Sequence, residues 1–121
     1  MSKTTRGYLQ DLSTYLDKVS TFTQSGRDAF YANEMAQLAV IRCYTVIGEI
    51  VKRLSPELRD TNPQIGWRKL AGFRDFLAHN YDEIILDFVW QAIEDLPALR
   101  AKIQALLNSL LDENDEDSDD T

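Results

Sequence analysis

The side chains best suited to chemistry stand together in residues 72–82, which read Gly-Phe-Arg-Asp-Phe-Leu-Ala-His-Asn-Tyr-Asp. Arg74 falls within the apolar rhythm between Leu70 and Leu77, where a helical bundle ordinarily carries an aliphatic residue. A guanidinium at such a position needs an anionic partner or a cavity to line. His79 is the single histidine of the chain, and an imidazole exchanges protons near neutral pH. Together the two residues offer anion binding and proton transfer.

The placement of these two side chains depends on where their helix ends. On an ideal helix His79 lies about 140° around the axis from Arg74, so the helix must end or distort at Ala78–His79 for the two to converge. Asn80 suits such an end because asparagine tolerates the left-handed conformation. Tyr81 returns to nearly the same face as Arg74 if the helix persists. We therefore expect a histidine at a frayed helix end, in a cleft beside an arginine.

The same spacing is compatible with a purely structural role. A lone histidine beside aromatic residues is most often an ordinary residue with satisfied hydrogen bonds. Arg74 can likewise form a simple salt bridge with Asp82, which follows it in the sequence. Spacing by itself favours this structural interpretation over a catalytic one.

The rest of the sequence excludes several classes of chemistry. It contains neither a GxGxxG nor a GxxxxGK[ST] phosphate loop. One histidine and one cysteine are too few for a transition-metal site built from these ligands, so no metal and no cofactor are predicted. The acidic pairs Asp82–Glu83 and Glu94–Asp95 stand at expected helix starts, where acidic residues interact favourably with the helix dipole. Cys43 lies on an apolar helix face and is interpreted as a packing residue.

The elements that must position these residues are predicted to be helices. Apolar residues at spacings of three and four predict five of them, at about 8–22, 28–54, 67–77, 84–93 and 97–110. Asp82 can cap the fourth helix, and Pro97 opens or kinks the fifth. Ser55-Pro56 and Asn62-Pro63 each place a capping side chain before a proline suited to a first helical turn. Gly48 predicts the close approach of a neighbouring helix. The predicted fold class is all-α, a single-domain bundle of about five helices.

The net charge of −7 is concentrated at one end of the chain. Residues 112–121 read DENDEDSDDT and hold seven acidic residues and no basic one. The remaining residues carry equal numbers of acidic and basic side chains, so the charge does not exclude a nucleic-acid partner. We predict a folded domain at 1–111 and an acidic, disordered tail at 112–121.

Three features predict a cytoplasmic protein with no membrane association. No apolar run approaches the roughly 20 residues that a membrane helix needs. The N-terminus has no apolar signal core. The single cysteine, Cys43, fits a reducing compartment.

Residues Arg74 to Tyr81 read Arg-x-x-x-x-His-x-Tyr, which resembles the signature of the HEPN superfamily and in particular of HepT-type toxins. The resemblance extends over about residues 5–110 and includes three flanking segments, Ile47–Glu49, Ile65–Trp67 and Val89–Trp90. Two departures stand out. Asp75 replaces an asparagine that is common in the family, and Gly66 stands where proline is frequent. Asp75 adds a negative charge near the site, which leaves its supporting role open.

The resemblance implies a metal-independent endoribonuclease toxin in which Arg74 and His79 are catalytic. Cleavage by the neighbouring 2′-hydroxyl needs a base, an acid and positive charge on the phosphate, which these residue types supply. Asp75, Asn80 and Glu49 are the candidate supporting residues; Glu49 either buttresses Arg74 or forms a plain intrahelical or surface ion pair. Family members of this type form homodimers, in which a two-fold axis would bring both His79 side chains into one cleft.

The resemblance also implies a partner and a rival function. The partner is an MNT-type nucleotidyltransferase antitoxin, which uses ATP and transfers AMP to Tyr81, so ATP is involved only through the antitoxin. The rival is a non-catalytic helical module that binds a nucleotidyltransferase partner or a nucleotide. The presence of both Arg74 and His79 favours the enzyme. The negative charge of Asp75, which repels phosphate, favours the non-catalytic module.

Overall fold

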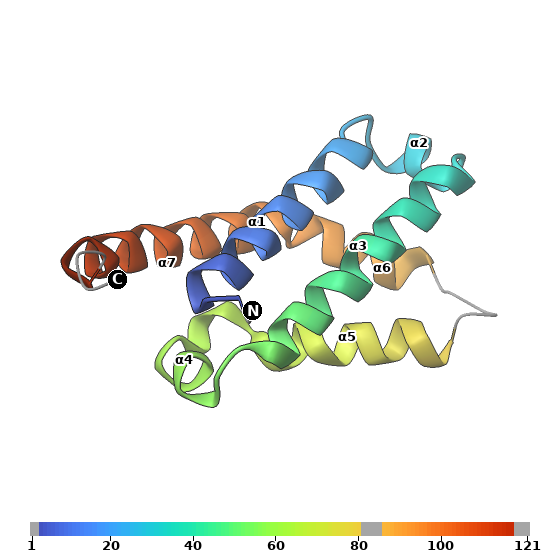
Figure 1. Ribbon diagram of the computed structural model, residues 1–121. Helices are drawn as coiled ribbons and strands as arrows, with labels where there is room; N and C mark the ends of the chain where they lie inside the picture. Colours follow the sequence, from blue (N-terminus) through green and yellow to red (C-terminus); the bar gives the residue numbers. More distant parts are fainter. Residues whose placement is uncertain (1–2, 81–85, 118–121) are drawn as a thin grey trace.

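The computed structural model describes residues 3–80 and 86–117, and every regular element in these ranges is helical (Figure 1). The predicted all-α fold class is confirmed. The described elements, in chain order, are α1 (Thr5–Phe22), α2 (Arg27–Tyr31), α3 (Glu34–Arg53), α4 (Pro56–Thr61), the 3-10 turn η1 (Pro63–Ile65), α5 (Trp67–His79), α6 (Leu86–Glu94) and α7 (Leu96–Asp117).

The core lies between α1, α3 and α7. α1 contributes an unbroken apolar stripe whose residues are fully buried: Leu9, Leu12, Leu16 and Val19. Their spacing of three and four places them on one helix face, which packs against α3 and α7. α3 is buried on more than one side because it also lies against α5, and Figure 1 shows these two helices side by side, running in opposite directions. α3 is therefore the central helix, as its broad apolar distribution predicts.

The predicted helix at 28–54 is wrong in one respect, because two helices occupy this range. α2 is a short helix that follows Gly26, whose φ of 94° lies in the region that favours glycine. Asn33 then interrupts the helix with an extended backbone, and its side chain accepts a hydrogen bond from the backbone N–H of Ala36. This is an ordinary N-cap for α3. The apolar pattern alone could not reveal it, since it continues through both helices.

Of the two caps predicted between α3 and α5, the structure contains the one at Ser55 and lacks the one at Asn62. The Ser55 side chain accepts a hydrogen bond from the backbone N–H of Leu58 and caps α4, as predicted. Asn62 makes no such cap ahead of η1; its side-chain amide donates to the carbonyl of Leu58 and closes the end of α4 instead. Gly66 follows in the left-handed region with a φ of 79°, which turns the chain into α5.

α7 runs alongside α1, and its C-terminal end extends past the rest of the bundle in Figure 1. Pro97 is its second residue, as expected for a proline in a first turn. The helix continues to Asp117, so it crosses the boundary predicted between a folded domain and a tail at residue 112. No glycine or proline follows Pro97 in this segment to end the helix earlier. No helix among the described residues is long and apolar enough to cross a membrane.

Candidate active site

Gly48 and Arg74 meet where α3 and α5 come closest. A Cβ atom added to Gly48 would lie 2.1 Å from the Cβ of Arg74 and 2.8 Å from its Cγ. It would also lie 3.2 Å from the carbonyl oxygen of Leu70. Only a residue without a side chain leaves room for the base of Arg74, so the predicted close approach of a helix at Gly48 is confirmed. The arginine stem is held directly against the backbone of the central helix.

The guanidinium of Arg74 lies between two carboxylates. Its Nη2 is 3.5 Å from Oε1 of Glu49 on α3, and its Nη1 is 3.3 Å from Oδ1 of Asp75. Its Nε is buried and has no hydrogen-bond partner among the described residues. The side chain is 29% exposed, so the guanidinium is reachable from solvent. Glu49 thus pairs with Arg74 between helices and makes no intrahelical pair among the described residues.

Asp75 is shared between two cations. The ammonium of Lys52, in the last turn of α3, donates to the same oxygen that Arg74 contacts. This hydrogen bond, followed by the one from Arg74, holds the pKa of Asp75 below its usual range. Asp75 is therefore a carboxylate that links α5 to α3 as well as a neighbour of the arginine.

An open polar cleft forms around Arg74, with Glu49, Lys52 and Arg53 as its other walls. The sequence analysis missed Lys52 and Arg53. A signal was available, because both follow Glu49 by one helical turn and therefore lie on the same face of α3. The polar cleft holds three cationic side chains and one acidic one, a composition suited to an anion.

His79 is the last residue of α5, and its ring is tied back to the preceding turn. Nδ1 lies 2.7 Å from the carbonyl oxygen of Asp75. A carbonyl can only accept, so Nδ1 carries the proton of this hydrogen bond and Nε2 is left unprotonated in the neutral ring. The side chain is exposed, so Nε2 is open to an incoming substrate.

Asn80 ends the helix, but not in the way that was predicted. Its φ of −119° lies outside the left-handed region. Its backbone N–H and its side-chain amide both donate to the carbonyl of Phe76, at 3.0 and 2.9 Å. These two hydrogen bonds satisfy a terminal carbonyl of α5, so no left-handed residue is required.

Arg74 and His79 both contact Asp75, the guanidinium its carboxylate and the imidazole its backbone carbonyl. α5 continues without interruption through His79, so the distortion expected at Ala78–His79 is absent and the helical period keeps the two side chains on different faces. The polar cleft around Arg74 is lined by Glu49, Lys52 and Arg53, and a cleft shared by Arg74 and His79 stays a prediction. Tyr81 and Asp82 lie outside the described residues, as does the alternative salt bridge between Arg74 and Asp82.

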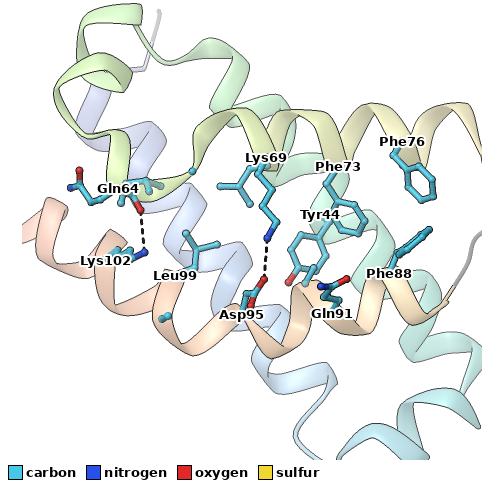
Figure 2. Close-up of a pocket in the computed structure, with 15 residues that line it drawn as sticks. Tyr44, Gln64, Lys69, Phe73, Phe76, Phe88, Gln91, Asp95, Leu99 and Lys102 are labelled. Carbon is cyan, nitrogen blue, oxygen red and sulfur yellow. Dashed lines mark hydrogen bonds and ion pairs between the residues drawn. The ribbon is translucent and has the colours of Figure 1, made fainter.

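Another side of α5 borders a half-open cavity of about 680 Å³, whose remaining walls come from α6, α7, η1 and part of α3. Figure 2 shows aromatic rings at one end of it and two polar links at the other. Lys69 pairs with Asp95 at 3.2 Å, and Lys102 donates to the carbonyl of Gln64 at 3.1 Å. We refer to this space as the aromatic cavity.

Two remaining predictions concern cysteine and metal ligands. Cys43 is buried in the core, and burial raises the pKa of its thiol, as expected for a packing residue. Among residues 3–80 and 86–117, no three or more histidine, cysteine, aspartate or glutamate side chains gather in a group that could hold a metal ion.

Comparison with known proteins places residues 12–106 in one family, described as ribonuclease HepT-like. The chain is 32% identical over 107 residues to a candidate RNase of Methanocaldococcus jannaschii, covering 87% of this chain and 92% of that protein. It is 31% identical over 108 residues to a candidate ribonuclease HepT of Thermococcus cleftensis, covering 88% and 98%. A candidate RNase of Caldanaerobacter subterraneus is 28% identical over 110 residues. No solved structure matches the chain significantly.

Proposed function

Because this chain belongs to the HepT-like ribonuclease family, of the HEPN type, we propose that it is a metal-independent endoribonuclease that cleaves RNA with Arg74 and His79. The observation that carries this proposal is the hydrogen bond between Nδ1 of His79 and the carbonyl of Asp75. It fixes the ring orientation and leaves Nε2 as a free, exposed base at the end of α5.

In the proposed reaction an imidazole takes the proton of a ribose 2′-hydroxyl, and the 2′-oxygen attacks the adjacent phosphorus. The bond from phosphorus to the 5′-oxygen breaks, and that oxygen receives a proton from an acid. The products are a 2′,3′-cyclic phosphate and a free 5′-hydroxyl, so no oxidant or further reactant is needed. Both proton transfers suit a positioned histidine.

Arg74 stabilises the negative charge that builds up on the phosphate. A guanidinium can donate to two phosphate oxygens at once, and it remains charged at every relevant pH. Its present partners, Glu49 and Asp75, are 3.5 and 3.3 Å away, so both contacts are loose enough to yield to a phosphate. Lys52 and Arg53 add positive charge to the same polar cleft.

A homodimer supplies what one chain lacks. Each chain has one histidine, and the period of the regular helix α5 separates Arg74 and His79 by about 140° around its axis. A two-fold axis near the end of α5 would bring two copies of the motif into one cleft, which then holds two equivalent sites. Arg74 of one chain would then act with His79 of the other.

The activity requires control in a cell, and we assign this to an MNT-type nucleotidyltransferase antitoxin that transfers AMP from ATP to Tyr81. Tyr81 follows Asn80 directly, so its hydroxyl belongs to the segment next to His79. An added AMP carries a phosphate that can pair with Arg74 and occupy the position of the RNA phosphate. Mass spectrometry of the chain co-expressed with its antitoxin should locate AMP on Tyr81; AMP on Tyr8, Tyr15, Tyr31 or Tyr44 instead would contradict this assignment.

The catalytic test uses two single variants and one control. His79→Ala and Arg74→Ala should each lower RNA cleavage about a hundredfold or more, with an unchanged helical circular dichroism spectrum. Arg100→Ala removes a guanidinium that pairs with Asp17 between α7 and α1, and it should cleave normally. Cleavage by the wild-type chain should persist in EDTA and leave a cyclic or 3′ phosphate. A strict metal requirement, or normal activity of His79→Ala, would overturn the mechanism.

Mixing the two inactive variants tests the dimer. If each site uses Arg74 from one chain and His79 from the other, a mixed dimer holds one intact site of two. Random mixing makes about half of the dimers mixed, so about a quarter of the wild-type activity should return. A fully active monomer in light scattering would contradict the shared site.

One observation favours the rival function, a non-catalytic module that binds a nucleotidyltransferase partner or a nucleotide. Two carboxylates already neutralise Arg74, which weakens its attraction for RNA. Purified protein that binds the partner but leaves RNA intact under all conditions tested would decide for the module.

A further inference from the structure

We propose that the aromatic cavity is a base-binding subsite, which receives one unstacked nucleobase of single-stranded RNA and gives the enzyme its base preference. This inference rests on the proposed ribonuclease function and names where the substrate is recognised. The subsite is separate from the polar cleft, because it lies on the other side of α5.

The lining of the aromatic cavity suits a flat aromatic ligand. Tyr44 and Phe73 meet edge to face with ring centres 5.2 Å apart, and Phe73 and Phe76 lie almost parallel at 6.4 Å. Phe88 closes the row from α6, 5.7 Å from Phe76 (Figure 2), and is half exposed. Bases held outside a helix are commonly bound by stacking on such rings.

The hydroxyl of Tyr44 supplies an unused hydrogen-bonding group. The residue is only 2% exposed, yet its oxygen has no hydrogen-bond partner among the described residues. In Figure 2 this oxygen points toward Asp95, and because it is screened from solvent, a base reaches it only when neighbouring side chains shift. Burial, with a smaller contribution from Asp95, raises the pKa of Tyr44, so the hydroxyl keeps its proton and can donate. A carbonyl oxygen or ring nitrogen of a base would provide the missing acceptor.

The charges around the aromatic cavity favour a nucleotide over an apolar protein segment. Its lining includes Lys69 and Lys102 but only one acidic residue, Asp95, in a chain whose net charge is −7. The two lysines are largely exposed, so their ammonium groups can exchange their present partners for a phosphate. An apolar helix or loop from another protein would gain nothing from these cations.

The position along α5 connects the aromatic cavity to the proposed chemistry. Phe76 precedes His79 by three residues, less than one helical turn, and its carbonyl receives both hydrogen bonds of Asn80. A nucleotide whose base stacks on Phe76 therefore has its backbone near the end of α5, where Nε2 of His79 is exposed. The base would belong to a nucleotide next to the cleaved bond.

Binding of mononucleotides tests the subsite without any cleavage. We would titrate the wild-type chain with AMP, GMP, CMP and UMP and follow the NMR signals of Lys69, Phe73 and the Gln91 side-chain amide. Ribose 5-phosphate serves as the control that lacks a base. We expect at least one nucleotide to shift these signals in a saturable way, and ribose 5-phosphate to leave them in place.

Three variants separate stacking, hydrogen bonding and general effects. Phe88→Ala should weaken nucleotide binding on the order of tenfold, since it removes one stacking ring. Tyr44→Phe keeps the ring and should weaken binding of the preferred base about fivefold, with a changed order of base preference. Phe22→Ala removes a similarly exposed phenylalanine from the end of α1 and should bind nucleotides normally.

The outcomes separate this inference from the proposed function. A chain that cleaves RNA while no mononucleotide moves the signals of the aromatic cavity would overturn the subsite and leave the ribonuclease in place. Saturable binding without any RNA cleavage would support the nucleotide site and reject the catalytic proposal. Signals that shift with protein concentration alone would show that a second copy fills the aromatic cavity, which also overturns the subsite.

Discussion

The two sides of α5 are built in opposite ways. Toward α3 the helices touch so closely that a single methyl group at Gly48 would collide with Arg74. On the side of α6 and α7, α5 borders the aromatic cavity of about 680 Å³. Two polar links span this cavity and aromatic rings line one end of it. Close contact fixes the position of one cation, whereas open space admits a ligand. One helix can therefore carry both a rigidly held catalytic side chain and the wall of a ligand-binding cavity.

Gly48→Ala should have the largest effect on stability, because it disrupts the close contact between α3 and α5. The added Cβ would lie 2.1 Å from Cβ of Arg74, which is the root of a side chain and cannot move without moving α5. We expect the free energy of unfolding to fall by about 3 kcal/mol or more, measured by urea denaturation. RNA cleavage should fall with it, since Arg74 is displaced.

Gly72 provides the matched control on the same pair of helices. It lies in α5, is exposed, and has no atom within 4 Å of the position that a Cβ would take. Gly72→Ala should raise the free energy of unfolding by about 0.5–1 kcal/mol, because alanine restricts the unfolded chain and favours the helix. Equal destabilisation by the two substitutions would show that α3 and α5 are not in close contact.

Tyr44→Phe tests the side of α5 that borders the aromatic cavity. Its effect on the free energy of unfolding should be smaller than that of Gly48→Ala and of opposite sign. A buried hydroxyl without a partner destabilises the folded chain, and phenylalanine keeps the ring while removing that group. We expect the free energy of unfolding to rise by about 1 kcal/mol in urea denaturation without nucleotide. A loss of stability would mean that the hydroxyl already has a hydrogen-bond partner and is not kept free for a ligand.

Asp75→Asn should have the smallest effect on stability. It tests the hydrogen bond between Lys52 and Asp75, which joins α3 to α5 beside the close contact at Gly48. The hydrogen bond from Lys52 lowers the pKa of Asp75 in the folded chain, so Asp75 stabilises the fold above its unfolded pKa of about 3.9. This contribution is lost as the pH falls through the lower, folded value. Urea denaturation should thus show a small difference between Asp75→Asn and the wild type near neutral pH that disappears in strong acid. A difference that persists unchanged in acid would exclude the charge as its cause.

The sequence predicts the helical bundle well because apolar spacing follows directly from helix geometry. The glycine in the middle of α3 also revealed the close contact with α5, since a glycine inside a helix needs a reason. The apolar pattern is continuous across Asn33 and hides the break, although asparagine is a favoured N-cap residue and its type alone offered a signal. Acidic composition predicts a disordered tail after residue 112, and α7 continues through this segment to Asp117.

The candidate site was predicted by residue type more reliably than by geometry. Arg74, Asp75 and Glu49 do lie together, since all three belong to the contact between α3 and α5. His79 contacts the backbone carbonyl of Asp75 from the end of α5, which stays regular to its last residue. The position of the aromatic cavity could not be predicted, because its walls come from five separate elements whose relative placement depends on the packing of the whole bundle. Only the tyrosine and phenylalanine residues in this region hinted at it.

The seating of Arg74 on the backbone of Gly48 also has an entropic consequence. An arginine on an open surface samples many rotamers and loses that freedom when it binds a phosphate. Here the wall formed by α3 confines Cβ and Cγ of Arg74 as soon as the chain folds. Most of the ordering cost thus falls on folding and little of it on each round of substrate binding. The guanidinium meets its substrate already preorganised, with only its distal atoms left to adjust.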